Sequence, residues 1–147
     1  MPKEYNLPIE NDPELLTEYG RAFAFINFVE FLLGEMILMR QKLYLGDKKE
    51  RDKIKDKTLG QQIKLAKGII DSNILDEISK LNEKRKIMAH GVTVGGVGDF
   101  LIVHNKGNHP LNKKSIGEVI TLARSCLGIM HEALLKGTNY EKFYPRR

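Results

Sequence analysis

Residues 22–39 read AFAFINFVEFLLGEMILM, and this stretch decides the class of fold. It is apolar over almost its whole length and is about as long as a lipid bilayer requires. Glu30 and Glu35 interrupt it, however, and a carboxylate in mid-span costs roughly 2–3 kcal/mol on insertion scales. We therefore expect this stretch to form a buried core helix that does not enter a membrane.

The sequence on either side predicts the ends of this helix. Asp12-Pro13-Glu14 predicts its start, because aspartate caps free N–H groups, proline fits the first turn and glutamate suits the positive end of the helix dipole. Gly46 predicts its end after Leu45. An almost fully apolar helix needs neighbours on several sides, so we expect a second copy of the chain to cover part of it in a homodimer. The large apolar residues that do not fit a single stripe are Phe23, Phe25, Phe28, Phe31, Leu32 and Met36.

Composition narrows the class of protein. The chain has 147 residues, of which 41% are hydrophobic and 29% charged, as expected for one globular domain. We expect an extended arm over residues 1–11, a helical core over 12–136 and a basic tail over 137–147. Cys126, the single cysteine, excludes a disulfide framework and a cysteine-based metal site. No secretory signal is visible in residues 1–11, so we expect a cytoplasmic protein, and its net charge of +5 permits an anionic partner.

Helix signals continue as far as residue 91. Residues 47–57 form a charge run that indicates a solvated linker or an exposed helix extension, with an RNA-contacting loop as the alternative. Thr58 and Gln61 have the spacing of a capping box, which predicts a second helix over residues 59–70. Apolar residues then recur in steps of three, four and seven, which predicts a third helix over residues 73–90 that ends at Gly91.

The pattern changes after Gly91. Residues 92–94 and 100–103 are β-prone and flank a glycine-rich turn, which predicts a β-hairpin. Residues 105–110 are expected to form an ordinary surface loop, since His104 and His109 have no cluster of cysteines or carboxylates beside them for a metal site. A last helix is predicted from near Asn112 or Ser115 to just before Gly137. The predicted fold is therefore mainly all-α: an up-down four-helix bundle with a short β-hairpin between the third and fourth helices.

The segment richest in chemistry is LNEKRKIMAHG, residues 81–91. Arg85 projects from the same stripe as Leu81 and Met88, and a guanidinium on a core-facing stripe needs a carboxylate, water or a functional cleft. His90 follows five residues later, so on one regular helix it points about 140° away from Arg85, with about 7.5 Å of rise. The two groups converge only if the helix unwinds near Gly91 or if a two-fold dimer brings both copies together.

Residues 85–90 resemble the R-x4-6-H motif of the HEPN superfamily (higher eukaryotes and prokaryotes nucleotide-binding). The surroundings are similar too, over roughly residues 13–136: a long first helix, the entry to the second helix at Thr58, a third helix ending in Ala89-His90-Gly91 and a closing helix. Many members of this superfamily are dimeric, metal-independent RNA endonucleases.

The resemblance implies an endoribonuclease without metal or cofactor, with Arg85 and His90 of both copies in one cleft. Histidine serves as base or acid near neutral pH, and arginine presents a fork of donors to phosphate oxygens. Attack by the RNA 2′-hydroxyl would yield a 2′,3′-cyclic phosphate and a 5′-hydroxyl. Lys84 and Lys86 would hold the RNA backbone by charge, and Asn82 would supply an amide to the site.

The resemblance leaves more than one function open. Lys86 stands directly after the motif arginine, where active members usually have a polar residue, often asparagine. An active protein of this kind would suit a toxin, paired with a nucleotidyltransferase-type antitoxin, or a phage-defence protein. Mannitol-operon-repressor-like proteins have a similar helical layout and are regulatory, and other relatives are dimerising or partner-binding modules.

The alternative to a catalytic role is a purely structural role for Arg85 and His90. Arg85 would then pair with Glu30 or Glu35 of the first helix, and His90 would cap the C-terminus of its own helix. One of these carboxylates would equally serve to orient the arginine in an active site.

Overall fold

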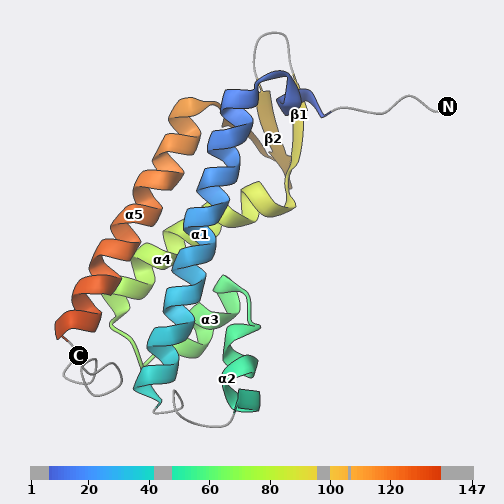
Figure 1. Ribbon diagram of the computed structural model, residues 1–147. Helices are drawn as coiled ribbons and strands as arrows, with labels where there is room; N and C mark the ends of the chain where they lie inside the picture. The colour runs from blue at the N-terminus through green and yellow to red at the C-terminus, as the bar shows by residue number, and fades with distance from the viewer. Residues whose placement is uncertain (1–6, 42–47, 96–99, 106, 137–147) are drawn as a thin grey trace.

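The computed structural model describes residues 7–41, 48–95, 100–105 and 107–136. Within these ranges the chain is mainly helical, with a small antiparallel sheet (Figure 1). The helices are η1 (Pro8–Asn11), α1 (Pro13–Arg40), α2 (Lys48–Lys55), α3 (Leu59–Ala66), α4 (Ser72–His90) and α5 (Lys113–Lys136). The strands are β1 (Val92–Gly95), β2 (Phe100–His104) and β3 (Gly107–Leu111). The mainly helical class is thus confirmed.

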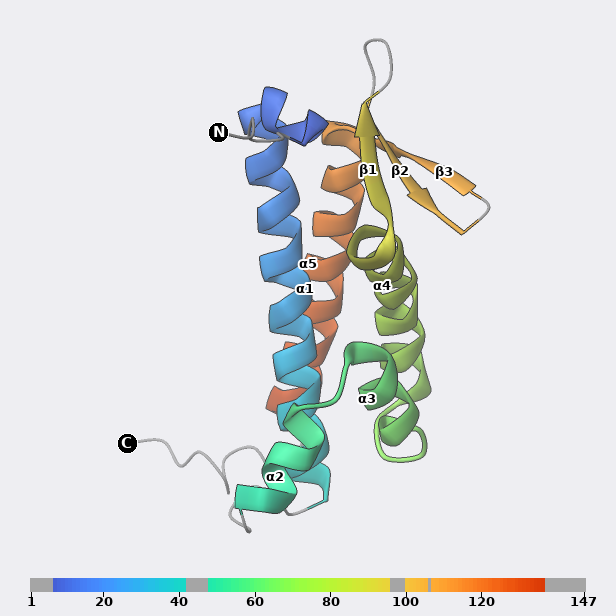
Figure 2. The same cartoon turned by 90° about the vertical axis from the view of Figure 1, so that its right-hand side faces the viewer.

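Three long helices form the body of the molecule. α1 and α5 start at the same end and run side by side, while α4 runs in the opposite direction against them (Figures 1 and 2). α2 and α3 have 8 residues each, which is about 12 Å of helix and less than half the length of α1. The predicted up-down order is therefore not seen, since α2 and α3 are too short to supply a fourth full-length helix that returns the chain between α1 and α4.

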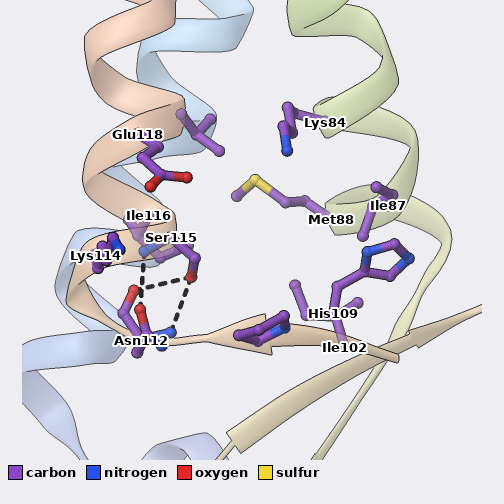
Figure 3. A pocket seen from close by; sticks show the side chains of 12 residues that line it. Lys84, Ile87, Met88, Ile102, His109, Asn112, Lys114, Ser115, Ile116 and Glu118 are labelled. Carbon is purple, nitrogen blue, oxygen red and sulfur yellow. Dashed lines mark hydrogen bonds between the residues drawn. The ribbon is translucent and has the colours of Figure 1, made fainter. Parts of the chain in front are cut away.

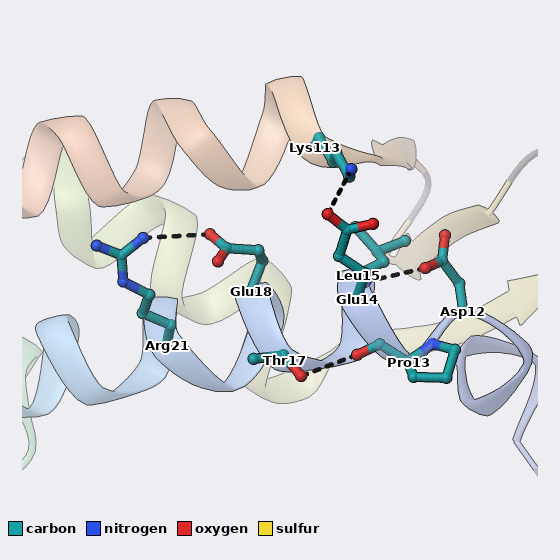
Figure 4. A network of polar contacts seen from close by, with 8 residues as sticks. All are labelled: Asp12, Pro13, Glu14, Leu15, Thr17, Glu18, Arg21 and Lys113. Atoms are coloured by element: carbon teal, nitrogen blue, oxygen red, sulfur yellow. Dashed lines mark hydrogen bonds and ion pairs between the residues drawn. The ribbon is translucent and has the colours of Figure 1, made fainter.

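The first turn of α1 forms as its sequence predicts. The Asp12 carboxylate accepts a hydrogen bond of 3.0 Å from the backbone N–H of Leu15, and Pro13 occupies the first helical position (Figure 4). Glu14 forms an ion pair of 2.8 Å with Lys113 at the start of α5, and this carboxylate raises the pKa of Lys113. The two parallel helices are thus joined at their N-terminal ends.

The wide apolar surface of α1 is covered mostly from within the chain. Ala22, Ile26 and Val29 are fully buried, and all residues from 33 to 39 are buried because α2 and α3 pack around this end of α1. The large apolar residues of α1 that remain exposed are Phe28, Phe31 and Leu16, with exposed fractions of 54%, 51% and 40%. The apolar surface of α1 that is left for a second subunit is therefore smaller than the sequence suggests.

α1 is also long and apolar enough, by length and composition, to cross a membrane, a test that core helices of soluble proteins pass as well. Of its most apolar window, 56% is buried inside the protein. Glu35 within it is 6% exposed and forms an ion pair with Lys55 of α2. Packing against the rest of the chain thus accounts for much of its apolar character.

The charge run forms a helix, α2, which Ile54 anchors to the core. α3 begins with the predicted capping box, in which Thr58 and Gln61 bond each other's backbone N–H groups, but it ends at Ala66 and not near Ile70. Gly34 in α1 makes room for the Gln62 amide, since a Cβ at Gly34 would lie 3.1 Å from its nitrogen.

The predicted hairpin is part of a three-stranded sheet in the order β1-β2-β3, with both pairs antiparallel. The predicted loop over residues 105–110 was wrong, because most of it forms β3. Pro110 is tolerated there since β3 is an edge strand, where a residue without an N–H interrupts no further pairing. Residues 8–11 of the predicted extended arm form η1, whose Ile9 is 2% exposed.

The first helix was predicted to run to Leu45, but α1 ends at Arg40, with Gln41 as its C-cap. The predicted turn over residues 96–99 and the basic tail over 137–147 fall outside the described residues. Cys126 lies in α5 and is fully buried. Burial raises the pKa of its thiol to about 11.

Candidate functional site

The Arg85 to His90 segment occupies the last turns of α4. Ile78, Leu81 and Met88 bury one side of this helix against the core, and Gly91 ends it. A side chain at Gly91 is excluded, because its Cβ would overlap the side chain of Ile102 and the carbonyl oxygen of Ile87. The chain therefore passes from α4 into β1 within one residue, and the sheet lies directly against the helix end.

α1 holds the same helix end from the other side. The Tyr19 hydroxyl donates a hydrogen bond of 2.7 Å to the carbonyl oxygen of Met88. This carbonyl is one of the last four of α4, which have no partner within the helix. Burial raises the pKa of Tyr19, so the hydroxyl stays protonated and able to donate at neutral pH. The C-terminal end of α4, which carries the motif, is thus held by contacts with both the sheet and α1.

Arg85 is oriented by its own helix. Its Nε donates a hydrogen bond of 3.1 Å to Oδ1 of Asn82, and Asn82 is itself 6% exposed. The Asn82 amide rests against Gly60 of α3, where a Cβ would approach its nitrogen to 3.2 Å. No further partner of the Arg85 guanidinium occurs among the described residues, so the terminal nitrogens remain available to an anion.

His90 stands apart from Arg85 within one copy of the chain. α4 is helical through His90, so the two side chains diverge by about 140°. His90 is exposed, and Gly91 caps the helix through its backbone N–H, which donates to Ile87. Within the described ranges no hydrogen bond of the His90 side chain is found, so the expected capping role is not seen.

The expected pairing of Arg85 with Glu30 or Glu35 is not formed in the part of the chain that is described. Tyr19 marks where α1 meets the end of α4, and Glu30 lies 11 residues further along α1, or about 16 Å. Arg85 is only about 4.5 Å before Met88 on α4. The carboxylates are therefore too far along the helix, and Glu35 pairs with Lys55 instead.

The predicted RNA-binding lysines lie on different sides of α4. Lys84 and Lys86 are two residues apart and so point about 160° away from each other. Lys86 is exposed beside the Asn82–Arg85 pair and forms an ion pair of 3.0 Å with Glu83. Lys84 lines a cavity on the opposite side of the helix. The structure therefore groups Asn82, Arg85 and Lys86 and separates Lys84 from them.

The sequence did not predict that His109 lies on a strand and lines a cavity. It stands on β3 opposite Ile102 of β2 and lines the same cavity as Lys84 (Figure 3). The alternation of Gly107, His109 and Leu111, with Leu111 buried, was the available signal for a strand. Among the described residues no group of three or more His, Cys, Asp or Glu side chains is placed to hold a metal ion.

No family model, curated protein or solved structure matches this chain.

Proposed function

We propose that this protein is a HEPN-like, metal-independent endoribonuclease that works as a homodimer in the cytoplasm. In this proposal α1, α3, α4 and α5 correspond to the four helices of the HEPN bundle, with α2 and the sheet as additions. Arg85 and His90 of both copies line one cleft, and the protein acts as a toxin, restrained by a nucleotidyltransferase-type antitoxin, or in phage defence.

The hydrogen bonding of Arg85 is the observation that best supports the proposal. Asn82 holds the guanidinium through Nε, and the terminal nitrogens have no partner among the described residues. An arginine held in this way presents two parallel N–H donors to phosphate oxygens and loses little freedom on binding. A purely structural arginine would be expected to have used these donors within the fold.

His90 supplies the proton chemistry. One imidazole takes the proton of the RNA 2′-hydroxyl as its oxygen bonds to phosphorus. The bond from phosphorus to the 5′-oxygen breaks, and the imidazolium of the second copy protonates that oxygen. Arg85 stabilises the negative charge on the phosphate during this step. Two copies are needed because one α4 cannot aim Arg85 and His90 at the same phosphate.

Lys86 widens the positive field around this site. It lies between Arg85 and His90 around the helix and is exposed, so it can contact RNA phosphates in exchange for its surface ion pair with Glu83. Lys84 stands on the other side of α4 and is not part of this RNA contact.

The test is cleavage of single-stranded RNA in EDTA. The wild-type chain is expected to produce 2′,3′-cyclic phosphate ends, and His90→Ala or Arg85→Ala is expected to lower the rate by about 100-fold or more. His131→Ala, an exposed histidine on α5, is the matched control and keeps full activity. Cleavage that persists unchanged in His90→Ala would rule the proposal out.

Exposed aromatic residues favour a second candidate, a regulatory or dimerising module like the mannitol-operon-repressor-like proteins. The rings of Phe28 and Phe31 lie 6.1 Å apart on the surface of α1, and such a pair is typical of a contact surface. In this case Arg85→Ala would lower the melting temperature or the fraction of dimer, and no preparation would cut RNA. Unchanged stability and assembly in Arg85→Ala would exclude this candidate.

A further inference from the structure

A second site candidate lies on a part of the α4 surface that includes neither Arg85 nor His90. A cavity of about 370 Å³ is enclosed by the last turns of α4, the β2–β3 edge of the sheet and the first turns of α5 (Figure 3). Pockets that bind small organic molecules start at about 300 Å³. The cavity is therefore large enough for a small ligand.

The floor of the cavity is apolar and comes from the core. Met88 closes it from α4, Ile102 from β2, and Ile116 and Val119 from α5. Each of these side chains is at most 5% exposed, so the floor is firmly packed on its inner side. A hydrocarbon or aromatic group of a ligand would bury apolar surface against this floor.

The two lysines that line the cavity differ from neighbouring lysines of α4 and α5 in their ion pairing. Three other lysines of α4 and α5 are paired with glutamates: Lys80 with Glu77, Lys86 with Glu83 and Lys113 with Glu14. Lys84 and Lys114, which line the cavity, have no carboxylate partner within the described part of the chain. Glu118 is the single carboxylate among the described lining residues, which leaves a net charge of +1 when His109 is neutral.

The polar groups at the start of α5 are already used within the protein. The Ser115 backbone N–H donates to Asn112 Oδ1 at 2.8 Å, and Ser115 Oγ accepts from the Asn112 backbone N–H at 3.0 Å (Figure 3). These bonds fix the shape of that wall and leave few donors for a ligand. Recognition of charge therefore falls to Lys84, Lys114 and His109.

Gly107 leaves space beside the His109 ring because it has no side chain. Gly107, two residues earlier on the same face of β3, lies so close that a Cβ there would be 3.1 Å from the His109 ring nitrogen Nε2. A Cβ at position 107 would require the His109 ring to shift by a few tenths of an ångström.

From these observations we propose that the cavity binds a small amphipathic monoanion: an apolar body that rests on Met88 and Ile102, with one carboxylate group held by Lys84. Lys114 adds to the positive field, His109 adds a ring N–H that can donate a hydrogen bond, and the Glu118 carboxylate opposes the field. This inference is independent of the proposed nuclease function, because the cavity contains neither Arg85 nor His90.

The experiment is a titration of the ¹⁵N-labelled full chain, followed by heteronuclear NMR, with three probes. 2-Naphthoate carries an apolar body and one charge, 2-naphthamide has the same shape without the charge, and inorganic phosphate has charge without the body. We expect 2-naphthoate to shift amide signals at Met88, Ile102 and Ile116 and to bind at least fivefold more tightly than either control probe. Equal affinity for the amide, equal affinity for phosphate, shifts mapped elsewhere, or no saturable binding would each overturn the proposal.

Variants test the same claim residue by residue. Lys84→Gln is expected to weaken 2-naphthoate binding at least fivefold and to leave the amide unchanged, whereas Glu118→Gln tightens 2-naphthoate binding. Lys86→Gln, two residues away on the other side of α4, is the matched control and changes neither. All three positions are exposed, so folding is expected to persist, and the ¹⁵N spectra report it directly. An unchanged naphthoate affinity in folded Lys84→Gln would overturn the assignment.

Discussion

The two sides of the C-terminal half of α4 differ in how their polar groups are used. On the motif side, defined by Asn82, Arg85, Lys86 and His90, two of the four polar side chains are bonded to each other and a third is paired within the helix. On the cavity side, defined by Lys84, Ile87 and Met88, the lysine has no partner among the described residues and apolar side chains dominate. One helix thus carries an oriented arginine on one side and contributes a lysine and apolar side chains to a cavity on another.

This difference teaches that charge alone does not assign function along a helix. Lys84 and Lys86 look equivalent in the sequence, yet helical geometry sends them to different surfaces. Substitutions on each side, and at the contacts that hold this end of α4, show whether the two sides depend on the same contacts and whether each can be altered alone.

The largest effect is expected from Gly91→Ala, which breaks both sides at once. The added Cβ would overlap Ile102 and the Ile87 carbonyl oxygen, so the sheet must move away from the helix end at a cost of about 1–3 kcal/mol. Urea unfolding measures this loss. Gly117→Ala in α5 is the control, since its Cβ meets nothing within 4 Å, and is expected to gain up to about 1 kcal/mol. Equal stability of the two variants would contradict the tight contact at Gly91.

Asn82→Ala is expected to disturb the motif side only. It removes the acceptor for Arg85 Nε from a buried position, which costs about 1–2 kcal/mol and lets the guanidinium turn away. Denaturant unfolding would show the loss, and RNA cleavage would fall with it, while 2-naphthoate binding stays constant. Asn27→Ala, at an exposed asparagine of α1, serves for comparison. Were cleavage to be insensitive to Asn82→Ala, the positioning role of the amide would be excluded.

Tyr19→Phe is expected to destabilise the C-terminal end of α4 less than Gly91→Ala does. The variant leaves the Met88 carbonyl without its donor, at a cost of about 0.5–1.5 kcal/mol near neutral pH. Burial raises the pKa of Tyr19 in the folded state, so its contribution is fully present below the pKa of the unfolded tyrosine, about 10, and is lost as pH rises through the folded value. The stability difference between wild type and Tyr19→Phe should therefore narrow above pH 10. Unfolding curves at pH 7 and above pH 10 decide this, and a difference that widens would contradict it.

Lys86→Gln is expected to have the smallest effect on stability. Its ion pair with Glu83 is exposed, so its removal costs less than about 0.5 kcal/mol. RNA binding should nevertheless lose one phosphate contact, lowering the slope of log affinity against log salt by about 1. Lys84→Gln is expected to leave that slope unchanged. If both lysines changed the slope equally, RNA would contact both sides of α4 and the distinction between them would fail.

Much of the helical layout was predictable from local signals. Asp12 and Pro13 predicted the start of α1, Thr58 and Gln61 the start of α3, and Gly91 the end of α4. These are short-range effects of capping and backbone geometry, which depend on a few neighbouring residues. For the same reason the periodicity of α4 predicted its buried side correctly.

Contacts between distant residues were not predictable in the same way. β3 was missed because Pro110 argues against a strand unless its place at the sheet edge is known. The sequence favours a carboxylate of α1 as the partner of Arg85, whereas the structure pairs it with the Asn82 amide, one turn away on the same helix. The offset between α1 and α4, which excludes Glu30 and Glu35, depends on tertiary packing.

The sealed thiol of Cys126 has a practical consequence for all of these comparisons. Because it is fully buried in α5 and its pKa is raised to about 11, a thiol reagent at neutral pH reacts with it only after this helix separates from the core. The labelling rate of the single cysteine therefore reports the opening of the bundle in any variant, without an added dye or an engineered probe.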